Sequence, residues 1–386
     1  MTPGARVAAA ISILNAIRDG QAAEQALTSW ARGSRFAGSK DRAAIRDHVF
    51  GVLRRNRSAG FAGGGETPRA RMAGMLALQG QELSALFTGA GHAPAPLSDE
   101  ELPSAEVPAD LGTLWDLPDW LVPAFQDSLG EEAAQIAKAL QDRAPVFLRV
   151  NAAKADVAKA ADLLAGEGVE TTANPLCATA LTVTEGARKI RQTRAYQDGV
   201  VELQDAASQA VVAALPDAPR VLDYCAGGGG KALALAAQPD REVFAHDHDP
   251  ARMRDLPERA ARAGARVSLL EGAAVADAAP FDLVLCDVPC SGSGAWRRAP
   301  QGKWLLTPER LAALNAVQDQ ILGTVTTLVA PGGTLAYATC SVLKSENEDR
   351  IAAFLGAHPD WSCTFEQRFA VNADGDGFYT AHLKRK

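Results

Sequence analysis

The chain has 386 residues, of which 47% are hydrophobic and 22% charged, and its formal net charge is −7. This composition excludes an intrinsically disordered protein, and the length predicts two or three globular domains. No apolar run reaches the roughly 18 residues that a membrane helix needs, and the first residues lack a secretory signal pattern, so a cytoplasmic protein is expected.

Charge is unevenly distributed along the chain. Residues 1–80 contain twelve Lys or Arg and five acids, a net charge of +7, whereas residues 81–137 contain eleven acids and no base. A basic module of this kind suits an anionic partner such as RNA. The same pattern is also typical of a solvated helix face, and charge alone leaves both interpretations open.

Apolar residues at helical spacing predict helices at residues 7–17 and 45–53, so the first domain is expected to be all-helical. Gly60 and the glycines at 63–65 predict a flexible loop, after which residues 70–87 resume a helical composition.

An acidic, Pro-rich connector begins near residue 91. Beyond it, residues 120–129 and 131–141 predict two helices, and residues 146–151 predict a strand. A helix near residues 154–166 and a strand at 200–203 complete a small α/β segment.

From residue 220 onward, short apolar strands alternate with helices, which predicts a doubly wound α/β fold with a parallel sheet. The predicted strands are residues 221–224, 243–247, 267–270, 283–287 and 334–338, and the predicted helices are residues 231–237, 250–263 and 308–328. We therefore divide the chain into a helical domain with its connector (1–125), a small α/β segment (126–200) and a doubly wound domain (201–386).

A glycine-rich loop follows the first strand of the doubly wound domain, and an acid follows the second. Four successive glycines separate Ala226 from Lys231, and Ala232 excludes a P-loop, which needs Ser or Thr there. Asp247, at the end of the second strand, is placed to accept the ribose hydroxyls of a nucleoside cofactor. The alternative is a tight turn with a solvent-exposed acid.

Two of the six cysteines follow strand ends, where ligands bind in such sheets. Cys290 and Cys340 are therefore candidates for a reactive thiolate. Cys177, Cys286 and Cys363 fit buried, reduced thiols better. His246 and His248 lack a third ligand, so no metal site is assigned.

Four segments carry a resemblance to a known family: DYCAGGGGK, AHDHD, DVPCSGSG and ATCSVLKSENED. Together they resemble the RNA (cytosine-5)-methyltransferases of the RsmB (Fmu/Sun) type. Further landmarks are residues 148–151, residues 203–205, Trp304 and residues 377–381. Residues 1–90 resemble the NusB-type helical domain of that family.

The chain departs from the family pattern at several positions. Gly227, Gly228 and Ala232 replace alanine, proline and threonine in the glycine-rich loop. Ala273 stands where an aspartate is usual, and Glu271 is the candidate substitute. Residues 299–301 replace His-Pro-Asp ahead of the Lys-Trp pair.

The resemblance implies a class I, Rossmann-like methyltransferase fold, S-adenosylmethionine as cofactor and an RNA substrate. It implies that Cys340 attacks carbon 6 of cytosine, that Cys290 assists product release, and that Asp287 hydrogen-bonds the base. The implied cofactor-binding residues are Cys225, Ala226, Gly227, Gly228, Gly229, Gly230, Lys231, Asp247, Glu271 and Asp287. The implied RNA-binding residues are Arg149, Asn151, Arg297, Arg298, Lys303 and Trp304.

Small-subunit rRNA is the substrate that the resemblance favours, with tRNA as the alternative, and a monomer is expected. A catalytically silent RNA-binding assembly factor would show a broken cysteine pair or a missing ribose acid, and this sequence keeps both. A nicotinamide-dependent dehydrogenase would need Gly-x-Gly-x-x-Gly followed by a hydride-transfer His or a Tyr–Lys pair, and no such combination supports it.

Overall fold

The computed structural model describes residues 1–385, which group into two compact units. The first unit contains Met1–Arg143 and Trp296–Leu306, and the second contains Ala144–Ala295 and the chain from Thr307 onward. The boundary predicted at 125/126 therefore falls inside the first unit, because residues 126–143 pack with its helices. The division into three domains stays an interpretation of the sequence.

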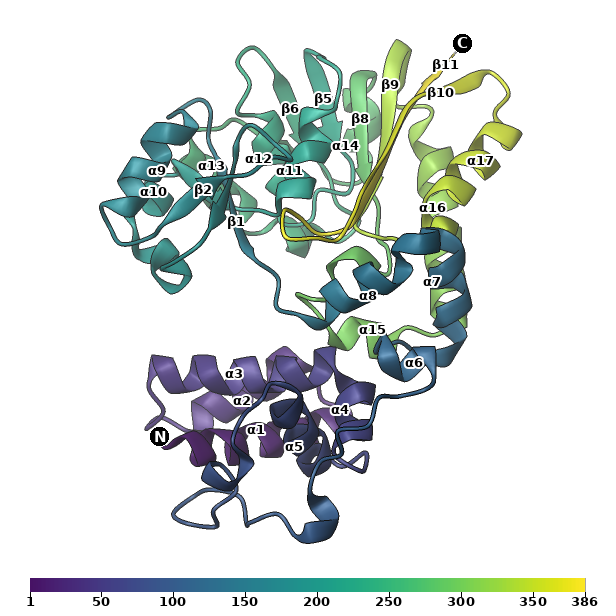
Figure 1. Cartoon of the computed structure of the whole chain (residues 1–386). Coiled ribbons are helices and arrows are strands. Elements are labelled where there is room, and N and C mark those ends of the chain that lie inside the picture. Colours follow the sequence, from purple (N-terminus) through teal and green to yellow (C-terminus); the bar gives the residue numbers. More distant parts are fainter. Residues whose placement is uncertain (386) are drawn as a thin grey trace. The chain divides into compact units, whose positions relative to one another are not determined.

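The first unit is helical throughout, as predicted (Figure 1). Its helices are α1 (Pro3–Arg18), α2 (Ala23–Gly33), α3 (Ser39–Arg54), α4 (Asn56–Ala62), α5 (Pro68–Leu78), α6 (Leu111–Leu114), α7 (Val122–Leu129), α8 (Ala133–Gln141) and α15 (Gln301–Leu305). Helices α1 and α5 both begin with threonine and proline, which suits a helix start. Thr2 Oγ1 accepts from the Ala5 amide at 3.2 Å, and Thr67 Oγ1 accepts from the Ala70 amide at 3.1 Å.

The glycines between residues 60 and 74 correct the prediction of a flexible loop. Gly60 lies within α4 and is buried, and only residues 63–67, which begin with Gly63–Gly65, separate α4 from α5. A Cβ on Gly63 would lie 2.0 Å from the Ala70 carbonyl oxygen, and a Cβ on Gly74 would lie 2.0 Å from that of Ala59. The glycines thus let the two helices pack closely. Helix α5 ends at Leu78, earlier than predicted, because the chain turns at residues 79–80.

The second unit contains two sheets. The smaller sheet is antiparallel and has the strand order β2-β3-β1-β4. Its strands are β1 (Val146–Val150), β2 (Thr171–Ala173), β3 (Ala180–Val183) and β4 (Val201–Leu203). Helices α9 (Val157–Ala165) and α10 (Arg194–Gln197) contact it. The predicted strands at 146–151 and 200–203 and the predicted helix near 154–166 are confirmed.

The larger sheet has the strand order β10-β11-β9-β8-β5-β6-β7. Its strands are β5 (Arg220–Asp223), β6 (Glu242–Ala245), β7 (Ser268–Leu269), β8 (Phe281–Asp287), β9 (Val329–Thr339), β10 (Trp361–Phe369) and β11 (Phe378–Arg385). Strands β5 to β9 are parallel, which confirms the predicted doubly wound fold. The structure adds β11 and β10 as an antiparallel pair beside β9.

Helices flank this sheet and connect its strands (Figure 1). They are α11 (Ala206–Ala213), α12 (Gly230–Leu235), α13 (Leu256–Ala263), α14 (Ala274–Ala278), α16 (Pro308–Val325) and α17 (Glu348–Ala357). Apolar side chains on the two faces of the sheet form two buried clusters, one around Val221 and Leu285 and one around Leu222 and Val284. Neighbouring strand residues thus face opposite ways, as the strand period requires.

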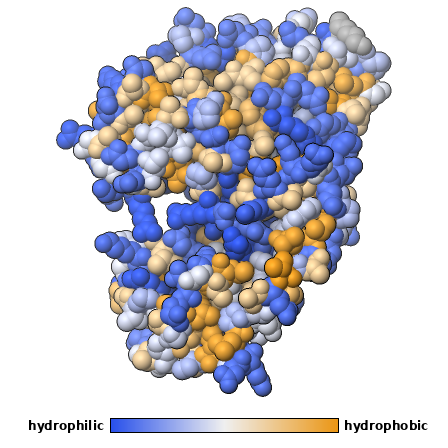
Figure 2. Space-filling model, viewed as in Figure 1, coloured by the Kyte–Doolittle hydropathy of each residue, from blue (hydrophilic) through white to orange (hydrophobic). Residues whose placement is uncertain are grey.

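Hydrophilic and hydrophobic residues are intermixed on the face of the molecule in Figure 2. Within residues 1–385, no helix is long and apolar enough to cross a membrane.

Candidate functional site

The carboxyl ends of β5, β6, β8 and β9 carry the polar residues that the sequence singles out. Strand order reverses around β5, and ligands bind at such a switch point in doubly wound sheets. Two adjoining cavities lie there, with volumes of about 610 Å³ and 440 Å³, and they share Cys225, Arg252 and Pro289. The first also contains Lys231, Asp287, Cys290 and Cys340, and the second also contains Tyr224, His246, Asp247, Val317 and Ile321.

The glycine-rich loop between β5 and α12 lines the first cavity. Gly227 and Gly229 have φ angles of +51° and +78°, a region that residues with a Cβ rarely adopt. A Cβ on Gly229 would also lie 2.2 Å from the Leu256 side chain. The Gly227 amide donates to Asp247 Oδ2 at 2.8 Å, so the acid at the end of β6 fixes the loop. Asp247 also pairs with Arg252 at 3.1 Å.

Lys231 and Asp287, the last residue of β8, form a partly buried ion pair. Lys231 Nζ donates to Asp287 Oδ2 at 2.7 Å, and the lysine side chain is only 8% exposed. Burial disfavours the ammonium, but the Asp287 carboxylate outweighs this effect, so the pKa of Lys231 is raised. The lysine therefore remains charged at neutral pH and keeps a positive charge beside Cys340, which lines the same cavity.

Asp223, the last residue of β5, is fully buried close to Lys231 and Asp287. Neither of its carboxylate oxygens has a hydrogen-bond partner within the described residues. Burial and the nearby Asp287 carboxylate raise the pKa of Asp223 from 3.8 to about 7. An ionised Asp223 thus destabilises the folded protein, and this cost appears as the pH rises toward 7.

Replacing Asp223 with asparagine should remove this pH dependence. A folded-state pKa above the unfolded value means that wild-type stability is retained near pH 4 and lost as the pH rises through about 7. The free energies of unfolding of Asp223→Asn and wild type should therefore be similar near pH 4. Above pH 7 the variant should be more stable by up to about 4 kcal/mol, at about 1.4 kcal/mol per pKa unit. Urea titrations between these pH values test this, and parallel stability profiles would contradict it.

The two cysteines predicted to react lie side by side. Cys290 Sγ and Cys340 Sγ are 3.4 Å apart, although 50 residues separate them in the chain. The hydrogen bond with Cys340, together with burial, raises the pKa of Cys290 well above its ordinary value. Either sulfur can be the donor in this contact.

A buried carboxylate joins the two cysteine loops, and it was absent from the predicted site. Glu346 Oε1 accepts from the Ser291 amide at 2.8 Å, and its Oε2 accepts from the hydroxyls of Ser291 and Ser341, each at 2.5 Å. Each serine directly follows one of the cysteines. Gln318 Nε2 donates to the same carboxylate at 3.1 Å and to the Pro289 carbonyl at 3.0 Å. Glu346 therefore holds both loops in one arrangement.

Removing the charge of Glu346 should cost much more stability than removing that of a neighbouring, partly exposed acid. Glu346→Gln weakens hydrogen bonds to a buried charged group, each worth about 1.5–3 kcal/mol. Its free energy of unfolding should therefore fall by at least ~2 kcal/mol in urea titration. Glu348→Gln is the control, because Glu348 forms a partly exposed pair with Arg368 that should contribute less than about 1 kcal/mol. Equal losses in the two variants would contradict the role of Glu346.

Known protein families are similar to most of this chain. The family model described as 16S rRNA methyltransferase RsmB/F matches residues 210–384, and the ferredoxin-like domain of RsmF/B-like methyltransferases matches residues 117–189. The chain is 34% identical over 285 residues to the ribosomal RNA small subunit methyltransferase B of Salmonella arizonae. This match covers 70% of the chain and 66% of that relative. The chain belongs to the RsmB/F methyltransferase family.

Solved structures share the fold. The protein PH0851 has a TM-score of 0.79 and 22% identity, with 100% of this chain and 99% of that chain covered. A methyltransferase homologue from Pyrococcus horikoshii has a TM-score of 0.62 and 24% identity, with 70% of this chain and 96% of that chain covered. These likenesses establish a Rossmann-like methyltransferase fold for the family member described here.

Arg149 and Asn151, which the family resemblance assigns to RNA binding, are both buried in this RsmB/F family member. Arg149 is 7% exposed, and its guanidinium donates to Gln204 and, at 2.6 Å, to the Gly230 carbonyl. Asn151 Nδ2 donates to the carbonyls of Gly199 and Ala263. Both side chains therefore connect β1 and its end with the doubly wound part of the unit. Arg149 holds the glycine-rich loop through the Gly230 carbonyl.

The residues near α15 that the resemblance assigns to RNA binding have partners within the first unit. The last carbonyls of α3 lack intrahelical partners, as at any helix end. Trp304 Nε1 donates to the Leu53 carbonyl at 2.6 Å, and Lys303 Nζ donates to that of Arg54 at 3.2 Å. Arg297 is 3% exposed, and its own carbonyl accepts from Arg54 Nε. Lys303 and Trp304 thus cap α3 within the first unit. Of the predicted RNA-binding residues, only Arg298 is exposed.

Glu271 lies outside both cavities, and two residues that the sequence did not indicate line the second one. Glu271 follows β7, is exposed and lines neither cavity, so it is not positioned as the substitute for Ala273. Val317 and Ile321 of α16 line the second cavity instead. Their position in a long helix gives no sign of this role, since helices are apolar on the face that packs against a sheet.

Proposed function

We propose that this protein transfers a methyl group from S-adenosylmethionine to carbon 5 of a cytosine in small-subunit rRNA. The observation that carries the proposal is the approach of two cysteine sulfurs to 3.4 Å at adjacent strand ends, in the cavity that also contains the Lys231–Asp287 pair. A simple methyl transfer needs no cysteine, whereas a poorly nucleophilic carbon needs covalent activation. Membership of the RsmB/F family supports rRNA as the substrate.

The residues of the two cavities fit S-adenosylmethionine. The left-handed glycines let the backbone approach a ligand closely, and residues 226–231 would hold its amino-acid part. Asp247 would accept from the ribose, and Val317 and Ile321 offer an apolar wall for the adenine. When bound, this cofactor supplies a methyl group on a positively charged sulfur, which a carbon nucleophile can accept.

Loss of the Asp247 carboxylate should weaken cofactor binding. Asp247→Ala removes hydrogen bonds to a charged acceptor, each worth about 1.5–3 kcal/mol, so the affinity for S-adenosylmethionine should fall at least about tenfold. It also removes the acceptor of the Gly227 amide, which loosens the loop. Titration calorimetry measures the affinity, with the exposed Asp255→Ala as control. An unchanged affinity in Asp247→Ala would remove this residue from the site.

The two cysteines would then divide the covalent chemistry. The Cys340 thiolate adds to cytosine carbon 6, forming a sulfur–carbon bond and making carbon 5 nucleophilic. Asp287 accepts a hydrogen bond from the edge of the base and so stabilises a proton on the ring nitrogen as the adduct forms. After methylation, carbon 5 loses its proton to Cys290 in its thiolate form, the electron pair of that bond re-forms the ring double bond, and the bond to Cys340 breaks with the electron pair left on the Cys340 thiolate. Cys290 assists this last step.

Formation of the adduct also changes how readily the Cys290 thiol loses its proton. The hydrogen bond with Cys340 is the largest cause of the raised pKa of Cys290. Once the Cys340 sulfur is bonded to carbon, it is a much weaker hydrogen-bond acceptor and carries no charge. Cys290 can therefore ionise more readily when a proton acceptor is needed, which is the order that elimination requires.

Mass spectrometry of nucleosides tests the proposal. Unmodified small-subunit rRNA is incubated with the protein and S-adenosylmethionine that carries a deuterated methyl group, and the RNA is then digested. We expect labelled 5-methylcytidine, resolved chromatographically from its N4- and 2′-O-methyl isomers. A parallel reaction with tRNA identifies the alternative substrate. The absence of labelled 5-methylcytidine from both reactions, with the cofactor bound, would favour a silent assembly factor and contradict the proposal.

A further inference from the structure

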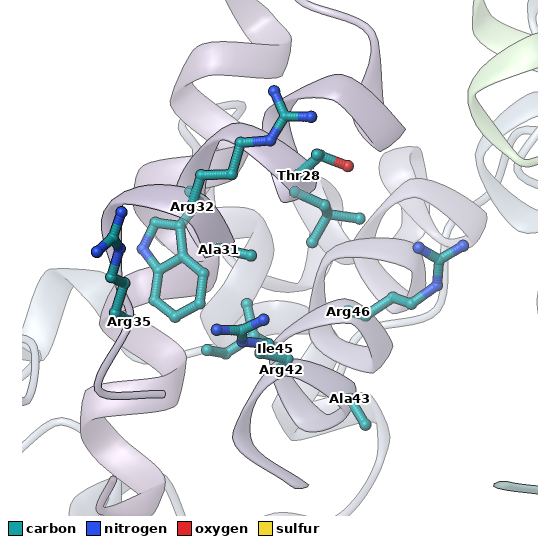
Figure 3. Close-up of a pocket in the computed structure, with 10 residues that line it drawn as sticks. Thr28, Ala31, Arg32, Arg35, Arg42, Ala43, Ile45 and Arg46 are labelled. Carbon is teal, nitrogen blue, oxygen red and sulfur yellow. The ribbon is translucent and has the colours of Figure 1, made fainter. Parts of the chain in front are cut away.

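A cavity of about 680 Å³ lies between α2 and α3 in the helical unit, far along the chain from the residues of the candidate active site. Figure 3 shows Arg32, Arg35, Arg42 and Arg46 around it. Its remaining lining is mostly apolar and includes Leu27, Trp30, Ala31, Ala43 and Ile45. We call this cavity with its four arginines the arginine groove.

The acids near the arginine groove leave most of its charge unbalanced. Residues 23–54 contain six Lys or Arg and three acids. Asp41 pairs with Arg6 and the N-terminal amine, and Asp47 pairs with Arg143, so neither neutralises the groove. Glu24 pairs with Arg46.

The other three arginines of the groove have no acid partner in the described part of the chain. All three are exposed, and Arg42 donates only to the Ala37 carbonyl. Three guanidinium groups thus lie around one concave surface with their charge available (Figure 3). A solvated helix face would spread such charges apart rather than gather them around a hollow.

Aromatic side chains accompany these charges. Trp30 lines the groove, and Phe36, next to Arg35 in the chain, is 76% exposed. Arginine side chains bind phosphates through paired donors, and aromatic rings stack on bases that are not in a duplex. A duplex offers its phosphates but not its base faces. The combination of guanidinium groups and aromatic rings therefore matches unpaired RNA better than a duplex or an acidic peptide.

We propose that the arginine groove binds an unpaired segment of the substrate RNA, away from the cytosine that is methylated. This inference rests on the proposed function, because a methyltransferase that acts on RNA gains affinity and register from contacts outside its active site. Phosphates would bind Arg32, Arg35 and Arg42, and a base would stack on Trp30 or Phe36.

Binding of a labelled oligouridine by the full-length protein tests the groove. This probe contains no cytosine to methylate. Arg32→Gln/Arg35→Gln should lower the slope of log affinity against log salt concentration by about 1.4, since each phosphate contact on a single strand contributes about 0.7. Phe36→Leu, which keeps an apolar side chain, should weaken binding roughly 5- to 150-fold if the stacking is on Phe36, and Trp30→Leu should do so if it is on Trp30.

The matched control is Arg18→Gln/Lys138→Gln, which removes the same charge from exposed positions of the same unit. It should leave the salt slope within about 0.3 of wild type. Thermal unfolding confirms that each variant is folded.

An affinity and a salt slope in Arg32→Gln/Arg35→Gln equal to those of the control would overturn the proposal. This failure is distinct from failure of the proposed function, because wild type would still produce 5-methylcytidine.

Discussion

Cys340→Ala is expected to abolish methylation and to form no covalent complex with RNA, whereas Cys290→Ala is expected to accumulate one. Attack precedes elimination. Without the attacking sulfur no adduct forms, and without the sulfur that assists release the adduct forms but does not break down. The two sulfurs are 3.4 Å apart, which places both within reach of one base. Denaturing gel electrophoresis of each variant with substrate RNA and S-adenosylmethionine measures the complex directly.

Cys363→Ala is the matched control, because Cys363 lies on β10 and has no part in the cysteine pair. It should methylate at the wild-type rate and leave no complex. A stable complex in Cys340→Ala and none in Cys290→Ala would reverse the two roles. Wild-type activity in Cys340→Ala would show that methylation does not need a covalent bond to Cys340.

Asp287→Asn is expected to lower kcat by about 10²–10³, the usual effect of losing one preorganised electrostatic contact in an active site. Asparagine keeps the shape of the side chain but carries no charge to stabilise a proton on the ring nitrogen. It also leaves Lys231 without its anionic partner at 2.7 Å. Single-turnover kinetics with saturating RNA and cofactor separate this loss from a loss of binding.

Asp277→Asn provides the comparison, since Asp277 is exposed on α14 and lines neither cavity. Its kcat should remain within about twofold of wild type, as expected for a surface change away from the site. An Asp287→Asn protein that binds S-adenosylmethionine normally and turns over at the wild-type rate would show that the carboxylate does not act on the base.

Short apolar runs in the sequence predicted the site residues that follow the ends of strands. Short apolar runs located β5, β6, β8 and β9, and the residues after each run are those that a parallel sheet brings to one edge. Cys290 and Cys340 meet because β8 and β9 are neighbours, which the chain order of a doubly wound sheet already suggests.

Burial of charged residues could not be predicted in the same way. Arg149, Lys303 and Arg297 look like surface residues in the sequence, because charged side chains are seldom buried without partners. Arg149 and Lys303 donate to backbone carbonyls that come close only in the folded chain: Gly230 lies 81 residues from Arg149, and Arg54 lies 249 residues from Lys303. No local pattern indicates such a pairing.

The position of Glu346 was predictable from the sequence, but its role was not. It lies in the Ser-Glu-Asn-Glu segment that supported the family resemblance, so its position was marked but its role was not. An acid five residues beyond Ser341 would ordinarily be taken as exposed. Only the folded structure shows that it is buried and that serines from both cysteine loops donate to it.

The most direct test of the account is to identify the residue that carries the RNA in the Cys290→Ala complex. The complex is digested with nuclease and protease, and the nucleotide-bearing peptide is sequenced by mass spectrometry. We predict a methylated cytidine nucleotide attached to the sulfur of Cys340. A nucleotide on any other residue, or a cytidine without the added methyl group, would contradict the proposed order of attack, methylation and release.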